Sequence, residues 1–229
     1  MRTVDNAMPS GSALRLVLAA ERLFALHGID GVSLRQISVE AGSANNSAVH
    51  YHFGSKHSLV AAIFRHRLPQ LINERRLLSA RCDPDDLRSR IEAHFLPLLT
   101  LAETTDNHYV SFIEQLQRHE LGAQDGMLDL PEEGRRSNDE FRGDLDQLLG
   151  DLPERLRHLR IIQGQTLCVH TAADRERAVT AGVPGVSFEL FVDSFFDGLA
   201  GFLAAPASAA TQRHLRRAAD VDQPWLRLL

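Results

Sequence analysis

The organisation of this protein is decided by residues 16–56, which read LVLAAERLFALHGIDGVSLRQISVEAGSANNSAVHYHFGSK. Apolar residues recur at helical spacing near the start, with Leu16, Ala20 and Phe24 on one face. Gly28 follows in the usual position for a left-handed helix cap. Ser33 and a glutamine three residues later have the spacing of a capping box, which predicts the start of a second helix. The segment therefore begins with two short helices joined by a tight turn.

A third short helix is expected over residues 46–53, followed by a long helix from Ser55 to about residue 81. Pro69 lies inside the long helix and should bend it near Arg65, because proline lacks the backbone N–H. The short helices are too short to be stable alone, so they must pack together. A turn that starts at Gly42 joins the second to the third, as in helix-turn-helix motifs, which place their second helix in the major groove.

These residues resemble the DNA-binding domain of TetR-family regulators. The resemblance is carried by residues 19–24 (AAERLF), Gly28, residues 32–37 (VSLRQI), Ala41-Gly42 and, above all, residues 49–56 (VHYHFGSK). The last stretch is highly specific to the family, whereas a bare helix-turn-helix pattern is not. The chain departs from the family in having one extra residue between Gly42 and Phe53, within residues 43–46, and in having His50 where tyrosine is common.

The resemblance implies that the third helix supplies most of the contacts to DNA. Asn46 and Ser47 would lie near its N-terminus, where asparagine can pair with adenine and serine with several bases. Lys56 would grip a phosphate at the N-terminus of the long helix, where the helix dipole also favours anions. The predicted DNA contacts are Ser33, Arg35, Asn45, Asn46, Ser47, His50, Tyr51, His52 and Lys56.

Each of these residues also has a purely structural interpretation. Asn45 and Asn46 can form a polar turn, and the two histidines can be ordinary surface residues. Ser33 is a helix cap whether or not it also meets a phosphate. Arg35 can simply occupy an exposed helix face.

The charge is distributed unevenly along the chain. The net charge of −5 is made up of +5 over residues 1–81 and −10 over residues 82–229. A basic head on an acidic body indicates that only the head meets a polyanion. The strong bias to arginine, with a single lysine at position 56, does not explain the asymmetry.

Composition excludes several other classes of protein. No stretch approaches the roughly 18 uncharged apolar residues that a membrane span needs, and the N-terminus lacks the pattern of a signal peptide. Cys82 and Cys168 are the only cysteines and form neither a disulfide framework nor a metal motif. We therefore expect a cytoplasmic protein with no membrane association, no metal and no cofactor.

Residues 82–229 predict a helical body, with helices near 85–103, 107–121, 132–149, 153–180 and 187–204. The last of these is apolar nearly all round, which is more than one core-facing stripe requires. We interpret it as half core and half subunit interface, paired with the helix before it; a fully buried helix in a monomer is the alternative. The predicted dimer residues are Leu156, Leu159, Gln163, Phe188, Phe191, Val192, Phe195, Gly198, Leu199 and Phe202.

A small-molecule effector is expected within the body, as the resemblance implies. Aromatic and aliphatic side chains would line an apolar cavity, with His94 and Gln115 as polar anchors. The alternative is that these residues are ordinary core. The predicted pocket residues are His94, Phe95, Leu99, Tyr109, Phe112, Gln115, Leu116 and Phe141.

The sequence thus predicts an all-α chain with an N-terminal three-helix helix-turn-helix DNA-binding domain and a C-terminal helical ligand-binding and dimerisation domain. The divisions are residues 1–54 for the tail and DNA-binding domain, 55–81 for the connecting helix and 82–229 for the body. The expected function is a homodimeric, ligand-responsive regulator, released as a repressor from a palindromic operator on double-stranded DNA by a small apolar effector.

Alternatives remain at this point. A ligand-responsive activator has the same sequence features. An enzyme is not expected, because no nucleophile elbow, phosphate loop, HExxH or paired cysteine motif is present. An interaction module without DNA binding is disfavoured by the basic head, and a sequence-independent DNA binder by the acidic body.

Overall fold

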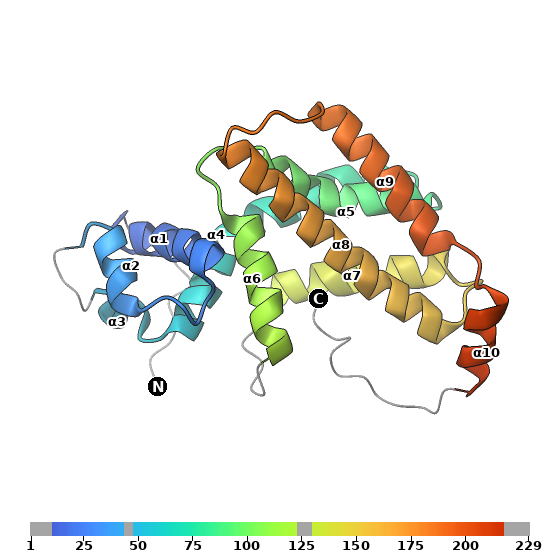
Figure 1. Ribbon diagram of the computed structural model, residues 1–229, viewed down its shortest axis with the longest axis horizontal. Coiled ribbons are helices and arrows are strands. Elements are labelled where there is room, and N and C mark those ends of the chain that lie inside the picture. The colour runs from blue at the N-terminus through green and yellow to red at the C-terminus, as the bar shows by residue number, and fades with distance from the viewer. Residues whose placement is uncertain (1–10, 44–47, 123–129, 218–229) are drawn as a thin grey trace.

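The computed structural model describes residues 11–43, 48–122 and 130–217, and within these ranges all regular structure is helical. A head of short helices lies at one end, and α4 leads from it into a larger body that ends at α10 (Figure 1). This confirms the predicted fold class. The helices are α1 (Gly11–His27), α2 (Leu34–Glu40), α3 (Ala48–Phe53), α4 (Lys56–Ser79), α5 (Leu87–Ala102), α6 (Tyr109–Gly122), α7 (Glu132–Leu148), α8 (Glu154–Thr180), α9 (Phe188–Ala204) and α10 (Ala209–Arg217).

Local signals in the sequence set the ends of the head helices. Gly28 has φ 73° after α1, a backbone conformation that glycine adopts without a steric penalty. Ser33 and Gln36 form the predicted capping box, since the Ser33 hydroxyl accepts from Gln36 N at 3.2 Å and the Gln36 side-chain oxygen Oε1 accepts from Ser33 N at 2.8 Å. Ser55 caps α4 in a similar way by accepting from Ser58 N at 3.1 Å.

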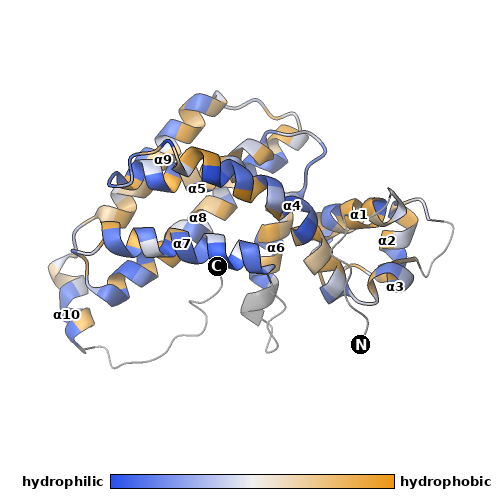
Figure 2. Cartoon of the chain, turned by 180° about the vertical axis from the view of Figure 1, so that it is seen from behind, coloured by the Kyte–Doolittle hydropathy of each residue, from blue (hydrophilic) through white to orange (hydrophobic). Residues whose placement is uncertain are grey.

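The hydrophobic core is continuous from the head into the body. Phe24 of α1 stacks against Phe112 of α6 with ring centroids 6.3 Å apart, and Phe112 in turn meets Phe64 of α4 at 5.8 Å. Apolar and polar positions alternate along most helices, as expected for amphipathic helices around a shared core (Figure 2). The head therefore packs directly on α6 as well as being joined to α4.

Two buried carboxylates reinforce this arrangement. Glu21 of α1 accepts a bidentate pair of hydrogen bonds from Arg67 of α4, at 2.7 and 2.6 Å. Glu176 of α8 accepts from the backbone N–H groups of Val110 and Ser111, both at 3.0 Å, and so caps the N-terminus of α6. Neither role was predicted, because each joins residues far apart in the sequence.

Helices α8 and α9 pack closely at Gly164. A Cβ atom at this position would lie 3.1 Å from Leu199 and 3.2 Å from Leu203, so only glycine permits the observed approach without a shift.

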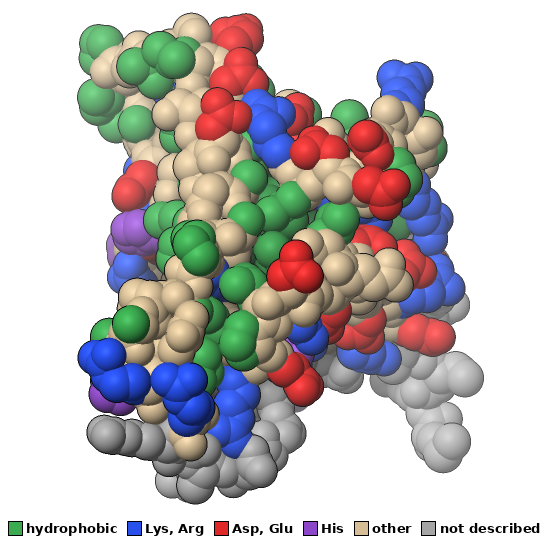
Figure 3. All heavy atoms as spheres, turned by 90° about the vertical axis from the view of Figure 1, so that its right-hand side faces the viewer, with side chains coloured by type: hydrophobic (Ala, Val, Ile, Leu, Met, Phe, Trp, Pro, Cys, Tyr) green, Lys and Arg blue, Asp and Glu red, His purple; other side chains and the backbone are tan. Residues whose placement is uncertain are grey.

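Viewed from the side that carries α10, the surface shows hydrophobic side chains among charged ones (Figure 3). Among the described helices none alone is long and apolar enough to cross a membrane, whereas Phe188–Ala204 and Ala209–Arg216, bent by 52°, meet the length and composition criteria only as a pair.

Candidate DNA-binding surface and ligand cavity

The outer face of α3 is polar and accessible. Tyr51 is 83% exposed, and His50 and His52 are exposed on either side of it. The His50 ring lies 3.1 Å from the Gly54 carbonyl oxygen, which fixes the imidazole at the end of α3. Val49 points the opposite way and is fully buried. The helix thus presents one side to the core and offers aromatic and imidazole groups outward.

The remaining predicted contacts surround this face. Arg35 and Ser33 are exposed on α2 and at its N-terminus. Lys56 begins α4, but its ammonium donates to the Ile29 carbonyl oxygen at 2.8 Å, so it also holds the α1–α2 turn against α4. The predicted base contacts Asn45, Asn46 and Ser47 lie outside the described residues.

Arg15 was missed by the sequence interpretation. It is exposed on α1 and, with Ser12, Tyr51 and His52, lines a hollow of about 290 Å³ between α1 and α3. A guanidinium there adds positive charge beside α3. The available signal was a basic side chain at a polar position of the first helix.

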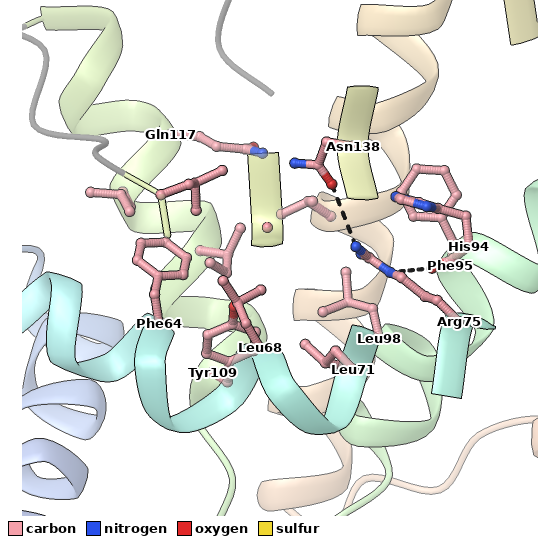
Figure 4. A pocket seen from close by; sticks show the side chains of 15 residues that line it. Phe64, Leu68, Leu71, Arg75, His94, Phe95, Leu98, Tyr109, Gln117 and Asn138 are labelled. Carbon is pink, nitrogen blue, oxygen red and sulfur yellow. Dashed lines mark hydrogen bonds between the residues drawn. The ribbon is translucent and has the colours of Figure 1, made fainter. Parts of the chain in front are cut away.

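A second hollow lies inside the body, between α4, α5, α6, α7 and α8. Its volume is about 90 Å³, and its walls are mainly apolar (Figure 4). The lining consists of Phe64, Leu68, Leu71 and Arg75 from α4; His94, Phe95 and Leu98 from α5; Tyr109, Ile113, Leu116 and Gln117 from α6; Leu130, which precedes α7; Gly134 and Asn138 from α7; and Val169 from α8.

Three polar residues of this cavity, Arg75, His94 and Asn138, lie close together. Arg75 donates from Nε to the His94 carbonyl oxygen at 2.9 Å and from a terminal nitrogen to Asn138 Oδ1 at 3.4 Å (Figure 4). The His94 ring stacks on Phe141 with centroids 3.8 Å apart. Burial, and then the nearby charges of Arg75 and Arg90, hold the pKa of His94 well below its ordinary value, so the imidazole is neutral at pH 7.

The comparisons with known proteins decide the family. The sequence model for "Bacterial regulatory proteins, tetR family" matches residues 16–63, which span most of the head and the start of α4. Residues 16–63 form a TetR-family DNA-binding domain. The protein is accordingly a DNA-binding transcriptional regulator rather than an enzyme. Among curated proteins, none matches the sequence significantly.

One solved structure shares the overall fold of this chain. The fatty acid degradation regulator FadR from Bacillus halodurans aligns over 85% of this chain and 97% of its own, with a TM-score of 0.55 and 16% identity. A putative transcriptional regulator from Pseudomonas aeruginosa PAO1 aligns over 93% and 99%, with a TM-score of 0.45 and 18% identity. At these identities FadR supports the fold alone, and the second structure adds no argument.

Half of the predicted pocket residues line the cavity of the body, namely His94, Phe95, Tyr109 and Leu116. Leu99 and Phe112 are completely buried in the core, and Phe141 lies behind the His94 ring. Gln115 faces the head, with its amide oxygen 3.7 Å from the position of a Cβ on Gly28. The sequence interpretation missed the α4 side, although Phe64, Leu68, Leu71 and Arg75 follow one another at helical spacing.

The predicted dimer residues divide into two groups. Leu156, Val192 and Leu199 are buried within their own chain, because α8 and α9 pack on each other and α9 also packs on α5. The others keep accessible surface on the outer side of α8 and α9, and Leu167 and Leu190 add to them with 45% and 58% exposure. The accessible predicted residues are Leu159, Gln163, Phe188, Phe191, Phe195, Gly198 and Phe202.

Proposed function

We propose that this regulator binds a palindromic operator as a homodimer and leaves it when a small molecule occupies the body cavity. The observation that carries the proposal is that two helices contact both the cavity and the head. Helices α4 and α6 line the cavity, and both also pack on α1 of the head. A change in the cavity therefore has a short, packed route to the DNA-binding surface.

The route runs through aromatic side chains. Phe64 and Tyr109 line the cavity and both contact Phe112, with ring centroids 5.8 and 6.2 Å away, and Phe112 stacks on Phe24 of α1. A ligand that displaces the first pair moves packed groups that touch the head, since protein cores transmit displacement rather than absorb it. A tenfold loss of operator affinity needs a preference of about 1.4 kcal/mol for one state.

Recognition of DNA is assigned to α3 and its surroundings. Asn45, Asn46 and Ser47 would read base edges in the major groove. His50 and Tyr51 would touch phosphates or a thymine methyl, and the remaining groups would hold phosphates and so set the position of the head. Those phosphate contacts are Ser33, Arg35, His52 and Lys56, to which the hollow between α1 and α3 adds Arg15.

The dimer would form through the outer faces of α8 and α9, where several large apolar side chains remain exposed. Two heads related by a twofold axis would meet half-sites about 34–36 Å apart or a multiple of that distance. Repression is the expected outcome, because a bound dimer obstructs a promoter.

Selection of random duplex DNA on the purified protein tests this proposal. We expect a palindromic motif bound with nanomolar affinity or tighter. Arg35→Ala should weaken binding about tenfold or reduce the salt dependence by about one phosphate contact. The matched control is Arg136→Ala, another exposed arginine, on α7. Enrichment of no motif, with only weak salt-sensitive binding, would contradict sequence-specific regulation.

A further inference from the structure

Arg75 is the charged group of the cavity, and its partners are all neutral. Its two described hydrogen bonds go to a backbone carbonyl and to the amide oxygen of Asn138. Arg67, about two helical turns earlier on α4, has the Glu21 carboxylate instead. Within residues 11–43, 48–122 and 130–217, no carboxylate pairs with Arg75. The charge of Arg67 is therefore neutralised by a carboxylate, and the charge of Arg75 is not.

The Arg75 guanidinium stays protonated at neutral pH although its partners are neutral. Desolvation by burial lowers the pKa of Arg75 to about 10, and nearby Tyr109 and Cys168 offset the shift only in part. A pKa of this size leaves the guanidinium protonated at pH 7. Arg75 keeps some accessible surface but is largely withdrawn from water. A largely desolvated charge without a counterion is costly, and hydrogen bonds to neutral acceptors compensate for only part of that cost. The cavity should therefore bind an anion more favourably than a neutral molecule or a cation.

Another donor in the cavity is also without a partner. Gln117 Nε2 is buried and has no hydrogen-bond acceptor among the described residues. Gln117 lines the same cavity as Arg75 and Asn138, from the α6 side (Figure 4). The walls between these polar groups are leucine, isoleucine and phenylalanine side chains. The cavity therefore offers N–H donors to an acceptor and an apolar surface to the rest of a ligand.

We propose that the effector is a small organic acid, whose carboxylate pairs with Arg75 and whose apolar part occupies the space between α4, α5 and α6. This inference rests on the proposed function, which makes the cavity the effector site. A cation would be repelled by Arg75, and a neutral molecule would leave the guanidinium without a counterion. The planar fork of arginine suits a carboxylate because it can donate two parallel hydrogen bonds.

The size of the cavity limits the acid. At about 90 Å³ it is smaller than the cavity of about 150 Å³ that accommodates benzene in an engineered protein. A short chain is the largest body that enters without displacing Phe64 or Leu68, and a ring requires that displacement. Displacement of these α4 side chains by a slightly larger acid is also what the proposed route to the head requires.

The test measures binding of matched pairs of probes to the full-length protein by isothermal titration calorimetry at pH 7. The acids are benzoate, phenylacetate, hexanoate and octanoate, and each is compared with its own primary amide. Acetate and inorganic phosphate are the controls for an anion without an apolar part. We expect at least one acid to bind more than about tenfold tighter than its amide, since removing one partner from an enclosed charge pair has effects of that size or larger.

The variant Arg75→Met examines the residue itself, and Arg76→Met, on the exposed side of α4, is the matched control. Arg75→Met should abolish the preference for acid over amide, and Arg76→Met should retain it. Without any probe, Arg75→Met should unfold at the same temperature as the wild type or higher, because it removes an enclosed charge that has no counterion. A clear loss of thermal stability in this variant would show instead that Arg75 serves to hold α5 and α7 together.

Other outcomes also overturn the proposal. These are equal binding of acids and amides, binding of none of the acids, or equally tight binding of acetate and phosphate. Operator binding is measured separately, so the two proposals can fail independently. If an acid binds through Arg75 without releasing operator DNA, the proposed regulation fails and this inference stands. If only neutral molecules release operator DNA, the proposed regulation stands and this inference fails.

Discussion

At the scale of single residues, the buried carboxylates of α1 and α8 show how this fold accommodates ionised groups. Glu21 is 2% exposed and Arg67 18% as side chains, and they satisfy one another with two hydrogen bonds. Burial disfavours the charge on Arg67, but the hydrogen bond and the charge of Glu21 prevail and raise its pKa. The pair joins the head to α4, so its loss should affect both stability and coupling.

Removing either partner leaves an enclosed charge without its counterion. We expect Glu21→Met and Arg67→Met each to lower the free energy of unfolding, by about 3–5 kcal/mol for the variant that leaves the more buried charge. The double variant should be more stable than the Glu21→Met single variant, because it buries no charge. Chemical denaturation of all four proteins measures this cycle. If the two effects simply add, the residues are not coupled as a buried pair.

Glu176 makes a prediction that depends on pH. Burial raises the pKa of its carboxyl above the ordinary 4.5, although bonds from Ser111 and Val110 oppose the shift. A folded pKa above the unfolded value means that the folded state holds the proton more tightly, so the contribution to stability falls as the pH rises from 4.5 through the folded pKa. Glu176→Ala should cost about 1–3 kcal/mol, since it leaves buried N–H donors of α6 unpaired.

The comparison is made by urea denaturation of wild type and Glu176→Ala at pH 5 and pH 8, with exposed Glu140→Ala as control. The difference in stability between wild type and Glu176→Ala should be larger at pH 5. A difference that grows toward pH 8 would show that the hydrogen-bond donors to Glu176 outweigh desolvation of its carboxylate.

At the scale of elements, α4 is the helix on which the function depends. It begins at Lys56 against the head, lines the cavity in its middle and contains Pro69 without interruption. The Pro69 ring is exposed, so it contributes little to packing. Its effect is on the backbone, where the carbonyl of Arg65 loses its usual partner four residues later.

Pro69→Ala should therefore change the mechanics of α4 with little loss of packing. We expect it to alter operator affinity, the response to a cavity ligand, or both, because a restored hydrogen bond to the Arg65 carbonyl makes α4 stiffer between the cavity and the head. Fluorescence anisotropy with operator DNA, with and without ligand, provides the measurement, and Gln70→Ala on the same exposed face is the control. Unchanged affinity together with an unchanged response would mean that Pro69 is not a joint.

Element boundaries were predictable because local residues determine them. The helix expected at 85–103 occupies Leu87–Ala102, and that expected at 187–204 occupies Phe188–Ala204. Capping serines, glycines with positive φ and prolines act within a few residues of themselves.

The cavity lining was less predictable, because it depends on which side of each helix meets a distant neighbour. Leu99 and Leu98 are adjacent in sequence, yet only Leu98 lines the cavity. Arg75 shows the same limit, since nothing near it in the sequence indicates that its partners would be neutral. The α3 surface was more predictable than the cavity lining, because its residues belong to a local motif.

At the scale of the whole molecule, the accessible apolar side chains of α8 and α9 predict self-association. Leu167→Glu and Phe202→Glu should convert a dimer into a monomer, because a buried carboxylate without a partner is strongly unfavourable. Light scattering coupled to size-exclusion chromatography measures the mass, and circular dichroism verifies folding. Leu77→Glu makes the same change at a 55% exposed leucine on α4 and should leave the mass unaltered. If the folded variants keep the mass of a dimer, the interface lies elsewhere. If the wild type already has the mass of one chain, the protein is a monomer.

The bond from Lys56 to Ile29 has a practical consequence, since Lys56 carries the only side-chain amine in the chain. Amine-reactive reagents have a single side-chain target here, and it lies where the head meets α4. Acylation would remove the charge of that amine and disturb its contact with the turn after α1, so the same reaction both labels the head and loosens it. A bound operator should shield the amine, which makes its rate of labelling a direct report on whether the head is engaged.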